Sequence, residues 1–423
     1  MWEWQVFTGK VQVLYLHQYF VARSGTAGWR SYEFSRYLVR KGHTVTVVSG
    51  CSEWSGLTLP AGQKRTVLSV DGIEVRLLGV PYSQRMSMRR RLGAFAGFML
   101  GACRDSGRVP RPDVVFATST PLTIAVPGMW AAWRWHCPFV FEVRDLWPAA
   151  PIELGVLKNP LLIAAARALE RLAYRRAAHV VALSPGMKDG IVAAGVPAEK
   201  VTVIPNASDV ELFRVPPEVG AKFRAEQGDL GRRPWLVYTG TFGRVNRVDW
   251  VVRLAEHVAR LAPEVAFVFY GSGSEREPTA ALARERGLLD RTVFFRDPLP
   301  RVELPKVLSA ATVLSSFAQD LPVMRTNSAN KFFDAFAAGK PVVINYGGWQ
   351  AQILEREGAG LALPHADLEG AARRLVAALR DLDWLARAAA ASARLGDTEF
   401  NRARLAAKLE EVLQRAVAAG RGN

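Results

Sequence analysis

One segment, Thr326 to Val343, constrains the fold more than any other part of the chain. It begins with a polar loop, continues as an amphipathic helix and stops at Gly339-Lys340-Pro341 ahead of β-branched residues. A helix that starts in this way presents unpaired backbone N–H groups at the positive end of its dipole, which favours a phosphate or pyrophosphate. Asp334 falls about one turn into the helix, where a carboxylate can reach sugar hydroxyls beside those phosphates. The segment therefore predicts a helix–strand unit with an anion site.

The order of apolar runs predicts two α/β domains. Strand, loop, helix and strand follow one another over residues 11–49, which is the start of a doubly wound parallel sheet. Further strand-like runs lie at 75–80, 114–118, 139–143 and 180–183, and a second series occupies 235–240, 265–270, 292–295, 312–315 and 341–345. A chain of 423 residues also exceeds what one core usually serves.

The amino-acid composition limits the kinds of partner that the protein is expected to bind. The net charge of +16, from 55 Lys and Arg against 39 Asp and Glu, predicts an anionic partner: nucleic acid, an acidic lipid surface or a phosphorylated substrate. Basic residues interleaved with aromatics on a nucleic-acid-binding module are absent, so we expect no nucleic acid. The three cysteines form no metal-ligand pattern and no strand-end loop carries Asp-x-Asp, so we expect no metal. No apolar run reaches the ~18 residues of a spanning helix.

Eight motifs in register point to one family. In chain order they are LYLHQYF, SGTAGWRSYEFSRYLVRKGHTVTVVS, FEVRDLWPAAPIELG, VALSPGMKDGI, VTVIPNASDVELF, VYTGTFG, YGSGSERE and NSANKFFDAFAAGKPVV. Together they resemble glycosyltransferase family 4 of the GT-B fold, in particular the bacterial transferases that build O-antigen, capsule and colanic-acid-type polysaccharides. The resemblance implies two Rossmann-like domains facing a cleft, a nucleotide-sugar donor, retention of anomeric configuration, and no cofactor or metal.

The resemblance also implies domain roles. We expect an N-terminal tail over residues 1–10, an acceptor-binding domain over 11–205, a linker over 206–234 and a donor domain over 235–400. Residues 401–423 are expected to form a helix that packs back toward the N-terminal domain.

Donor-binding residues are expected in both domains. The resemblance assigns this role to Gly25, Thr26, Arg244, Gly273, Arg296, Asn327, Ser328, Asn330, Lys331 and Asp334. The family usually has two acidic residues here, and Thr326 occupies the place of the first, so the polar loop is expected to orient the sugar. Arg247 is an alternative to Arg244, because the family's Lys-Gly is absent. The structural alternative for Lys331 is an exposed side chain on a capped helix.

Reaction-site residues are expected after the strand at 139–143. Asp145 is expected to accept the acceptor hydroxyl's proton, and Arg144 to hold a phosphate or keep Asp145 ionised. His17 and Arg30 are candidate acceptor contacts. The alternatives are a strand-capping ion pair for Arg144 and Asp145, a packed strand-end histidine, and a solvated helix face for Arg30.

A basic, apolar segment follows the strand-like run at 75–80. Arg85, Arg89, Arg90, Arg91 and Phe95 belong to it, and such a helix can lie in the interface of an anionic membrane. The alternative is a domain helix with a solvated basic end. The membrane reading fits the polyprenyl-diphosphate-linked acceptors of the resembling family, and places the protein in the cytoplasm, peripheral on the inner face of the plasma membrane.

The function expected from these observations is transfer of a sugar, an N-acetylated hexosamine from its UDP form, to a lipid-linked or saccharide acceptor. Two alternatives remain open. One is a GT-B nucleotide-sugar 2-epimerase. The other is a non-catalytic nucleotide-sugar-binding protein, suggested by the missing first acid.

Overall fold

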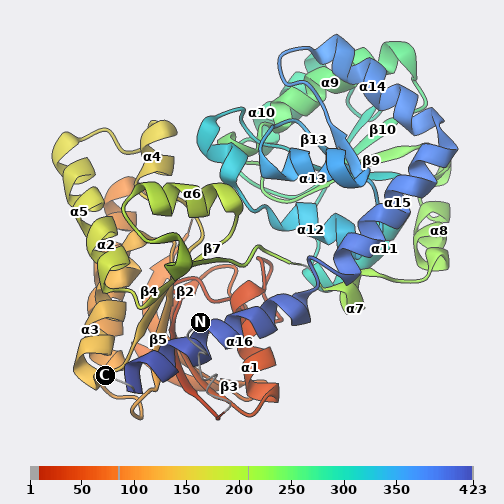
Figure 1. Ribbon diagram of the computed structural model, residues 1–423. Helices are drawn as coiled ribbons and strands as arrows, with labels where there is room; N and C mark the ends of the chain where they lie inside the picture. Colours follow the sequence, from red (N-terminus) through yellow and green to blue (C-terminus); the bar gives the residue numbers. More distant parts are fainter. Residues whose placement is uncertain (1–8, 84–85, 208, 422–423) are drawn as a thin grey trace. The chain divides into compact units, whose positions relative to one another are not determined.

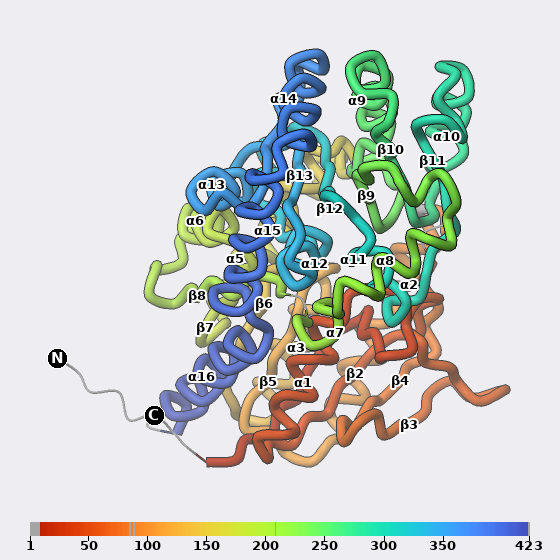
Figure 2. The backbone as a smooth tube through the Cα atoms, turned by 90° about the vertical axis from the view of Figure 1, so that its right-hand side faces the viewer, coloured from red at the N-terminus to blue at the C-terminus, as the bar shows by residue number. Residues whose placement is uncertain are grey.

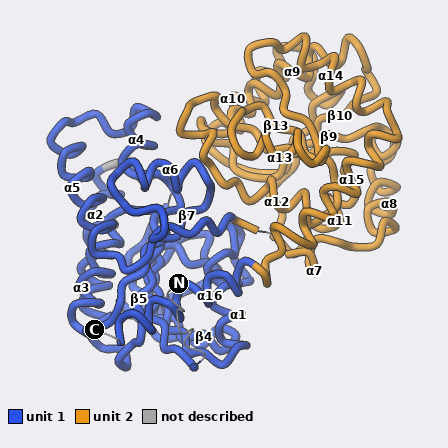
Figure 3. Tube along the Cα trace, in the orientation of Figure 1, with its two compact units in different colours: residues 1–205, 405–423 blue, residues 206–404 orange. Residues whose placement is uncertain are grey.

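The computed structural model describes residues 9–83, 86–207 and 209–421. Most of the tail expected over residues 1–10, and Arg85, lie outside these ranges. The chain divides into two compact units (Figure 3): unit 1 holds residues 1–205 and 405–423, and unit 2 holds residues 206–404. The chain therefore passes twice between the units.

Unit 1 is built on an eight-stranded sheet with the order β3-β4-β2-β1-β5-β6-β7-β8. The strands are β1 (Gln12–Leu16), β2 (Thr44–Ser52), β3 (Arg65–Val70), β4 (Ile73–Tyr82), β5 (Val114–Thr118), β6 (Phe139–Val143), β7 (His179–Ala182) and β8 (Val201–Val203). Neighbours are parallel except for the β3–β4 hairpin. The sequence pattern missed β3 because no residue of this edge strand is buried, so it carries no apolar run.

Helices cover both faces of this sheet. They are α1 (Arg30–Arg40), α2 (Met88–Ser106), α3 (Ala125–Trp135), α4 (Ala149–Glu153), α5 (Pro160–Arg176), α6 (Pro185–Ala193) and α16 (Arg402–Arg421). Figure 1 shows α2, α3 and α5 along one side of unit 1, and α3 packs against both of the others. Most of α16 belongs to unit 1, where Glu410 contacts His43 and Arg421 pairs with Asp113.

Unit 2 contains a fully parallel sheet with the order β11-β10-β9-β12-β13-β14. Its strands are β9 (Trp235–Thr239), β10 (Ala266–Tyr270), β11 (Val293–Arg296), β12 (Val313–Ser316), β13 (Val342–Ile344) and β14 (Gly360–Ala362). Successive residues of β9 enter different cores: Trp235 and Val237 pack with α12 (Asn330–Ala337), whereas Leu236 and Tyr238 pack with α9 (Val248–Leu261) and α14 (Leu368–Arg380). Burial on both faces explains why such strands are recognisable as continuous apolar runs.

The remaining helices of unit 2 are α7 (Val210–Phe213), α8 (Pro217–Ala225), α10 (Arg276–Glu285), α11 (Leu304–Ala310), α13 (Trp349–Glu357) and α15 (Leu382–Asp397). Figure 2 shows α14, α9 and α10 in a row on one side of the sheet, with α12, α11 and α8 on the other.

Residues 206–234, expected as a linker, are a folded part of unit 2. They contain α7, α8 and a 3₁₀ helix, and α8 packs so closely on α11 that a Cβ on Gly220 would lie 2.5 Å from the Ser309 carbonyl carbon. Arg224 donates hydrogen bonds to the carbonyls of Gly231, Arg233 and Ala310. The polar, proline-containing sequence suggested a linker, but its few buried residues are sufficient to dock these short helices.

Candidate donor and reaction sites

The N-terminus of α12 is open to an anion. The preceding residue, Ala329, has no side chain that caps the helix. The Asn327 amide instead folds the loop on itself, since Nδ2 donates to the Met324 carbonyl at 2.7 Å and Oδ1 accepts from the Ala329 N–H at 3.1 Å. Because the residue at the N-cap provides no capping hydrogen bond, the positive dipole end of α12 is available to a phosphate.

Lys331 extends from this first turn toward the loop after β9. Its Nζ donates to the Tyr238 hydroxyl at 3.0 Å and approaches Asn246 Oδ1 at 3.4 Å, and it lies 4.4 Å from the centre of the Tyr238 ring. Burial lowers the pKa of Lys331 to about 8, although Asp334 opposes this shift. The side chain is not the solvated one of the structural alternative, but an ammonium held in place with incomplete charge compensation.

Two loops from neighbouring strands meet beside this ammonium. A Cβ on Gly240, which has φ of +147°, would lie 3.2 Å from Lys331 Nζ. In the loop after β12, the Gln319 N–H donates to the Val245 carbonyl at 2.8 Å, and its Nε2 donates to the Arg244 carbonyl at 3.1 Å. The carboxyl ends of β9 and β12 and the start of α12 therefore form one backbone-lined site, where ligands of open α/β sheets usually bind.

The glycine turn after β10 supports this site from behind. A Cβ on Gly271 would lie 1.8 Å from the Gly240 carbonyl oxygen, and one on Gly273 would lie 2.3 Å from the Phe242 carbonyl oxygen. Gly273 was expected to contact the donor. Its glycine is already required by loop packing, so no ligand is needed to explain it.

Arg244 is the better placed of the two candidate arginines. Its side chain is 87% exposed and lies 3.6 Å from Glu275, whereas Arg247 makes two hydrogen bonds to Asp249 at 2.9 and 3.0 Å. An exposed pair of this kind is weak and easily exchanged for a phosphate. Arg296 is half-buried, with its guanidinium 5.7 Å from the centre of the Phe294 ring.

Asp334 occupies a different place from the one expected. Its two carboxylate oxygens accept hydrogen bonds from Arg301 at 2.7 and 3.2 Å, and both side chains are more than nine-tenths buried. Arg301 also lies over the Phe213 ring at 4.7 Å. We therefore correct the expected ribose contact: Asp334 is a core residue that ties α12 to the segment after β11.

The other two loop residues differ from each other. Ser328 is buried, and it accepts two hydrogen bonds from Asn206: one from the backbone N–H to Oγ at 3.0 Å and one from Nδ2 to the Ser328 carbonyl at 2.6 Å. Asn330 is partly exposed, and its amide makes no hydrogen bond with another described residue. Of these two, Asn330 is the one able to meet a ligand.

Unit 1 gathers its candidate reaction residues at the carboxyl ends of β1, β5 and β6. Asp145 is exposed and accepts a hydrogen bond from the Thr120 hydroxyl at 2.7 Å. Arg144 Nη1 lies 3.4 Å from His17 Nε2, and its backbone N–H donates to Ser119 Oγ. Burial, reinforced by Arg144, holds the pKa of His17 well below its usual range, so the ring is neutral and can accept from Arg144.

The Arg30 side chain is buried and hydrogen-bonded inside unit 1. Its Nε and Nη2 donate to Glu142 Oε1 at 3.0 and 2.7 Å, and its Nη groups also bond the carbonyls of Ile204 and Pro205. Burial raises the pKa of Glu142, but Arg30, Arg144 and the hydrogen bond from Thr118 together outweigh this effect, so the net shift is downward. The expectation that Arg30 contacts the acceptor is corrected, because all three guanidinium nitrogens are occupied inside the domain. The sequence could have indicated that Glu142 forms an ion pair, since a carboxylate within a buried strand requires a partner.

Gly25 has a structural requirement of its own. A Cβ there would lie 2.5 Å from the Trp54 carbonyl oxygen, so the glycine allows the loop before α1 to pack against the loop after β2. The neighbouring Thr26 is exposed, and its expected contact with the donor stays a prediction.

Part of the basic segment predicted to contact a membrane makes contacts within unit 1 instead. Arg89 and Arg90 are exposed, but Arg91 Nε donates to the Met86 carbonyl, and Phe95 stacks on Tyr82 with ring centres 5.8 Å apart. Phe95 is therefore only partly covered within unit 1, and its expected membrane contact stays a prediction. None of the helices within the described ranges is long and apolar enough to span a bilayer.

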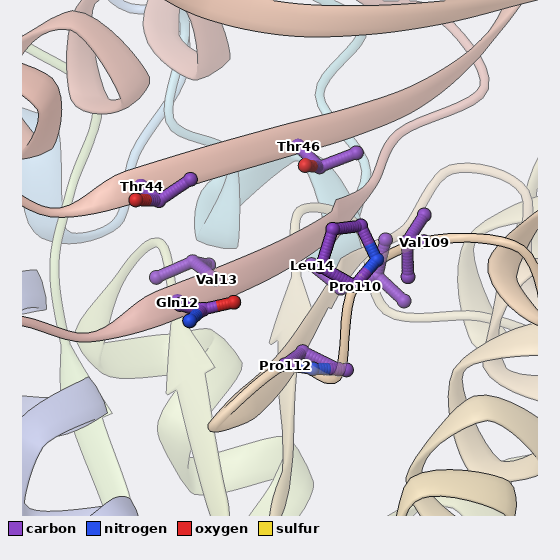
Figure 4. A pocket seen from close by; sticks show the side chains of 8 residues that line it. All are labelled: Gln12, Val13, Leu14, Thr44, Thr46, Val109, Pro110 and Pro112. Atoms are coloured by element: carbon purple, nitrogen blue, oxygen red, sulfur yellow. The ribbon is translucent and has the colours of Figure 1, made fainter.

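A small cavity lies away from these residues, at the amino-terminal ends of β1 and β2 (Figure 4). Its volume of about 20 Å³ holds roughly one water molecule. It is lined by Gln12, Val13, Leu14, Thr44, Thr46, Val109, Pro110 and Pro112. Its size excludes a nucleotide. Among the residues that the structure describes, no group of three or more His, Cys, Asp or Glu side chains is arranged to hold a metal ion.

Comparison with known families decides the class of protein. Residues 25–207 match the model of a glycosyl transferase 4-like domain, and residues 233–381 match that of glycosyl transferases group 1. The chain belongs to the GT-B glycosyltransferases. The expected fold and family are thereby confirmed.

Its relatives are distant and functionally diverse. The chain is 32% identical over 102 residues to an alpha-galactosylglucosyldiacylglycerol synthase of Streptococcus pneumoniae, covering 24% of this chain and 26% of that protein. It is 29% identical over 195 residues to a 2-deoxystreptamine glucosyltransferase of Streptomyces kanamyceticus, covering 44% and 46%. The matches thus span less than half the length of these two relatives. An alpha-maltose-1-phosphate synthase of Mycolicibacterium smegmatis is 24% identical over 72% of this chain and 85% of its own.

Solved structures agree on the fold. HepE of Anabaena, in complex with UDP and glucose, has a TM-score of 0.68 at 18% identity, over 95% of this chain and 99% of that one. The sucrose-phosphate synthase of Thermosynechococcus elongatus has a TM-score of 0.73 at 16% identity, over 96% and 100%. At these identities the likeness establishes the GT-B architecture alone.

Proposed function

We propose that the first turn of α12, with Lys331 and Arg244, binds the diphosphate of a UDP-sugar. The observation that carries this proposal is the Lys331 ammonium, held 3.0 Å from the Tyr238 hydroxyl between an uncapped helix start and the Gly240 loop. A bound diphosphate would supply the negative charge that this partly buried ammonium lacks. The UDP complexes of HepE support the choice of nucleobase.

The same groups would stabilise the departing nucleoside diphosphate. Preorganised cations and a helix dipole act most strongly where charge develops in the transition state. Lys331 takes the place of the family's absent Lys-Gly lysine in this proposal, and Arg244 provides the exposed second cation. We therefore propose a metal-independent transfer with retention of configuration, and transfer that persists in excess EDTA is its expected signature.

On the acceptor side, we propose that Asp145 receives the proton of the acceptor hydroxyl while Arg144 and neutral His17 orient the acceptor. Asp145 is exposed and held by Thr120, which suits a group that must meet a substrate. The sugar is proposed to be an N-acetylhexosamine, and the acceptor a lipid-linked or saccharide chain of a bacterial surface polysaccharide. Relatives named for glycolipid synthesis and for colanic acid biosynthesis support this context.

Calorimetry with UDP tests the donor site. Lys331→Met is expected to weaken UDP binding at least tenfold, since a charge-assisted hydrogen bond contributes roughly 1.5–3 kcal/mol. Lys340→Met is the matched control, because burial also lowers the pKa of Lys340 to about 8 although it lies beyond the C-terminus of α12. Equal UDP affinity in Lys331→Met and wild type would remove Lys331 from the donor site.

A further inference from the structure

The outward face of α5 is more apolar than a solvated helix requires. Among its residues only Ala173 and Tyr174 are buried, whereas Leu161 is 80% exposed, Leu162 is 52% exposed and Leu172 is also exposed. These leucines lie on one helix, so their exposure is not the scattered kind found on any protein surface.

The exposed apolar residues form a continuous stripe. Positions 161, 165, 168 and 172 follow the i, i+4, i+7, i+11 spacing of one helix face, and each is an exposed Leu or Ala. The buried Tyr174 points toward Phe141 of β6, with ring centres 6.3 Å apart. The stripe therefore faces away from the sheet.

Positive charge runs along the same helix. Arg167, Arg171 and Arg175, spaced four residues apart, are all exposed and follow one flank of the apolar stripe. The one acidic residue of α5, Glu170, is partly buried, and burial raises the pKa of its carboxyl group. The outward face of α5 thus presents leucine, alanine and arginine without a carboxylate.

The neighbouring elements expose further apolar and basic residues. Trp133 of α3, which packs beside α5, is 71% exposed and is followed by the exposed Arg134. Val156, in the loop before α5, is exposed as well, as is Leu100 of α2. The helices α2, α3 and α5 line one side of unit 1 (Figure 1), and α3 packs against both of the others.

We propose that this face, the outer stripe of α5 with Trp133, docks unit 1 on an anionic lipid bilayer. Leucine side chains enter the boundary between headgroups and acyl chains, the tryptophan ring lies at headgroup level, and the arginines meet lipid phosphates. Charge complementarity selects this occupant: a row of arginines beside small apolar residues matches a fluid anionic surface. The surface differs from the segment around Arg89 and Phe95 that the sequence pattern favours.

Vesicle co-sedimentation of the full chain without nucleotide tests the proposal, using phosphatidylglycerol–phosphatidylcholine vesicles and pure phosphatidylcholine vesicles. Wild type is expected to sediment with the anionic vesicles alone. Leu161→Glu with Leu162→Glu is expected to reduce the bound fraction at least tenfold. Leu382→Glu is the matched control, because Leu382 is 76% exposed on α15 of unit 2.

Two triple variants test whether binding depends on the position of the arginines or only on the total positive charge. Replacement of Arg167, Arg171 and Arg175 by Glu is expected to abolish binding, whereas the same change at the exposed Arg284, Arg374 and Arg387 of unit 2 is expected to leave most of it. Urea unfolding of every variant reports the folding of each unit, and UDP affinity reports donor binding by unit 2 independently of vesicles. Wild type that stays in the supernatant, or α5 variants that sediment like wild type, would overturn the proposal. Loss of binding in Arg89→Glu with Arg90→Glu alone would return the contact to the start of α2.

Discussion

Replacing Asp334 by Asn separates two roles for this carboxylate that the sequence and the structure assign differently. The Arg301–Asp334 pair has side-chain exposures of 9% and 8%. Breaking a buried pair by removing one partner leaves an uncompensated charge and costs roughly 3–5 kcal/mol. For a domain of this size each kcal/mol lowers Tm by about 2–4 °C, so a fall of roughly 6–20 °C is expected for unit 2.

The assay is thermal unfolding alongside UDP calorimetry. A domain-resolved signal, such as hydrogen exchange of α12 peptides, assigns the loss to unit 2, since a two-unit chain need not unfold in one step. The double variant Arg301→Met with Asp334→Leu is expected to recover much of the loss, because apolar residues of similar volume can replace a buried pair. UDP affinity at pH 6.5, where Lys331 is protonated in both proteins, is expected to change less than threefold.

The opposite result would refute this reasoning. Wild-type Tm with a tenfold or greater loss of UDP affinity in Asp334→Asn would place the carboxylate on the donor ribose, as the sequence pattern favours.

UDP affinity should fall as the pH rises through about 8 and this dependence should vanish in Lys331→Met, because the bound diphosphate favours the protonated ammonium; a flat calorimetric profile in wild type would exclude it. Glu142→Gln should destabilise unit 1 by about 3–5 kcal/mol in urea unfolding, by leaving Arg30 buried without a counter-charge; because the pKa of Glu142 is lowered on folding, its contribution exists above its ordinary value and is lost as the pH falls through the folded value. Gly271→Ala should abolish UDP binding or soluble expression, since its Cβ would overlap the Gly240 carbonyl oxygen, and a soluble variant with wild-type affinity would contradict that packing.

Much of the fold was predictable from the sequence. Parallel strands buried on both faces are continuous apolar runs, and the glycine, proline and polar residues between them mark the turns. The half-exposed β3 and the short β14 carry no such run and were missed. The folded nature of residues 206–234 was hidden because their helices are short and expose polar side chains.

For the candidate site too, local features were predictable from the sequence and contacts between distant residues were not. The sequence by itself determined the two-domain family, the loop and helix start at 326–334, and the presence of Lys331 there, because these are local patterns. The tertiary structure decided which charged side chains are available to a ligand. Lys331 contacts Tyr238. Arg30 instead pairs with Glu142, 112 residues away in the chain, and Asp334 pairs with Arg301, 33 residues away. Whether a charged side chain meets a ligand or another side chain depends on burial and pairing across elements, which no local spacing encodes.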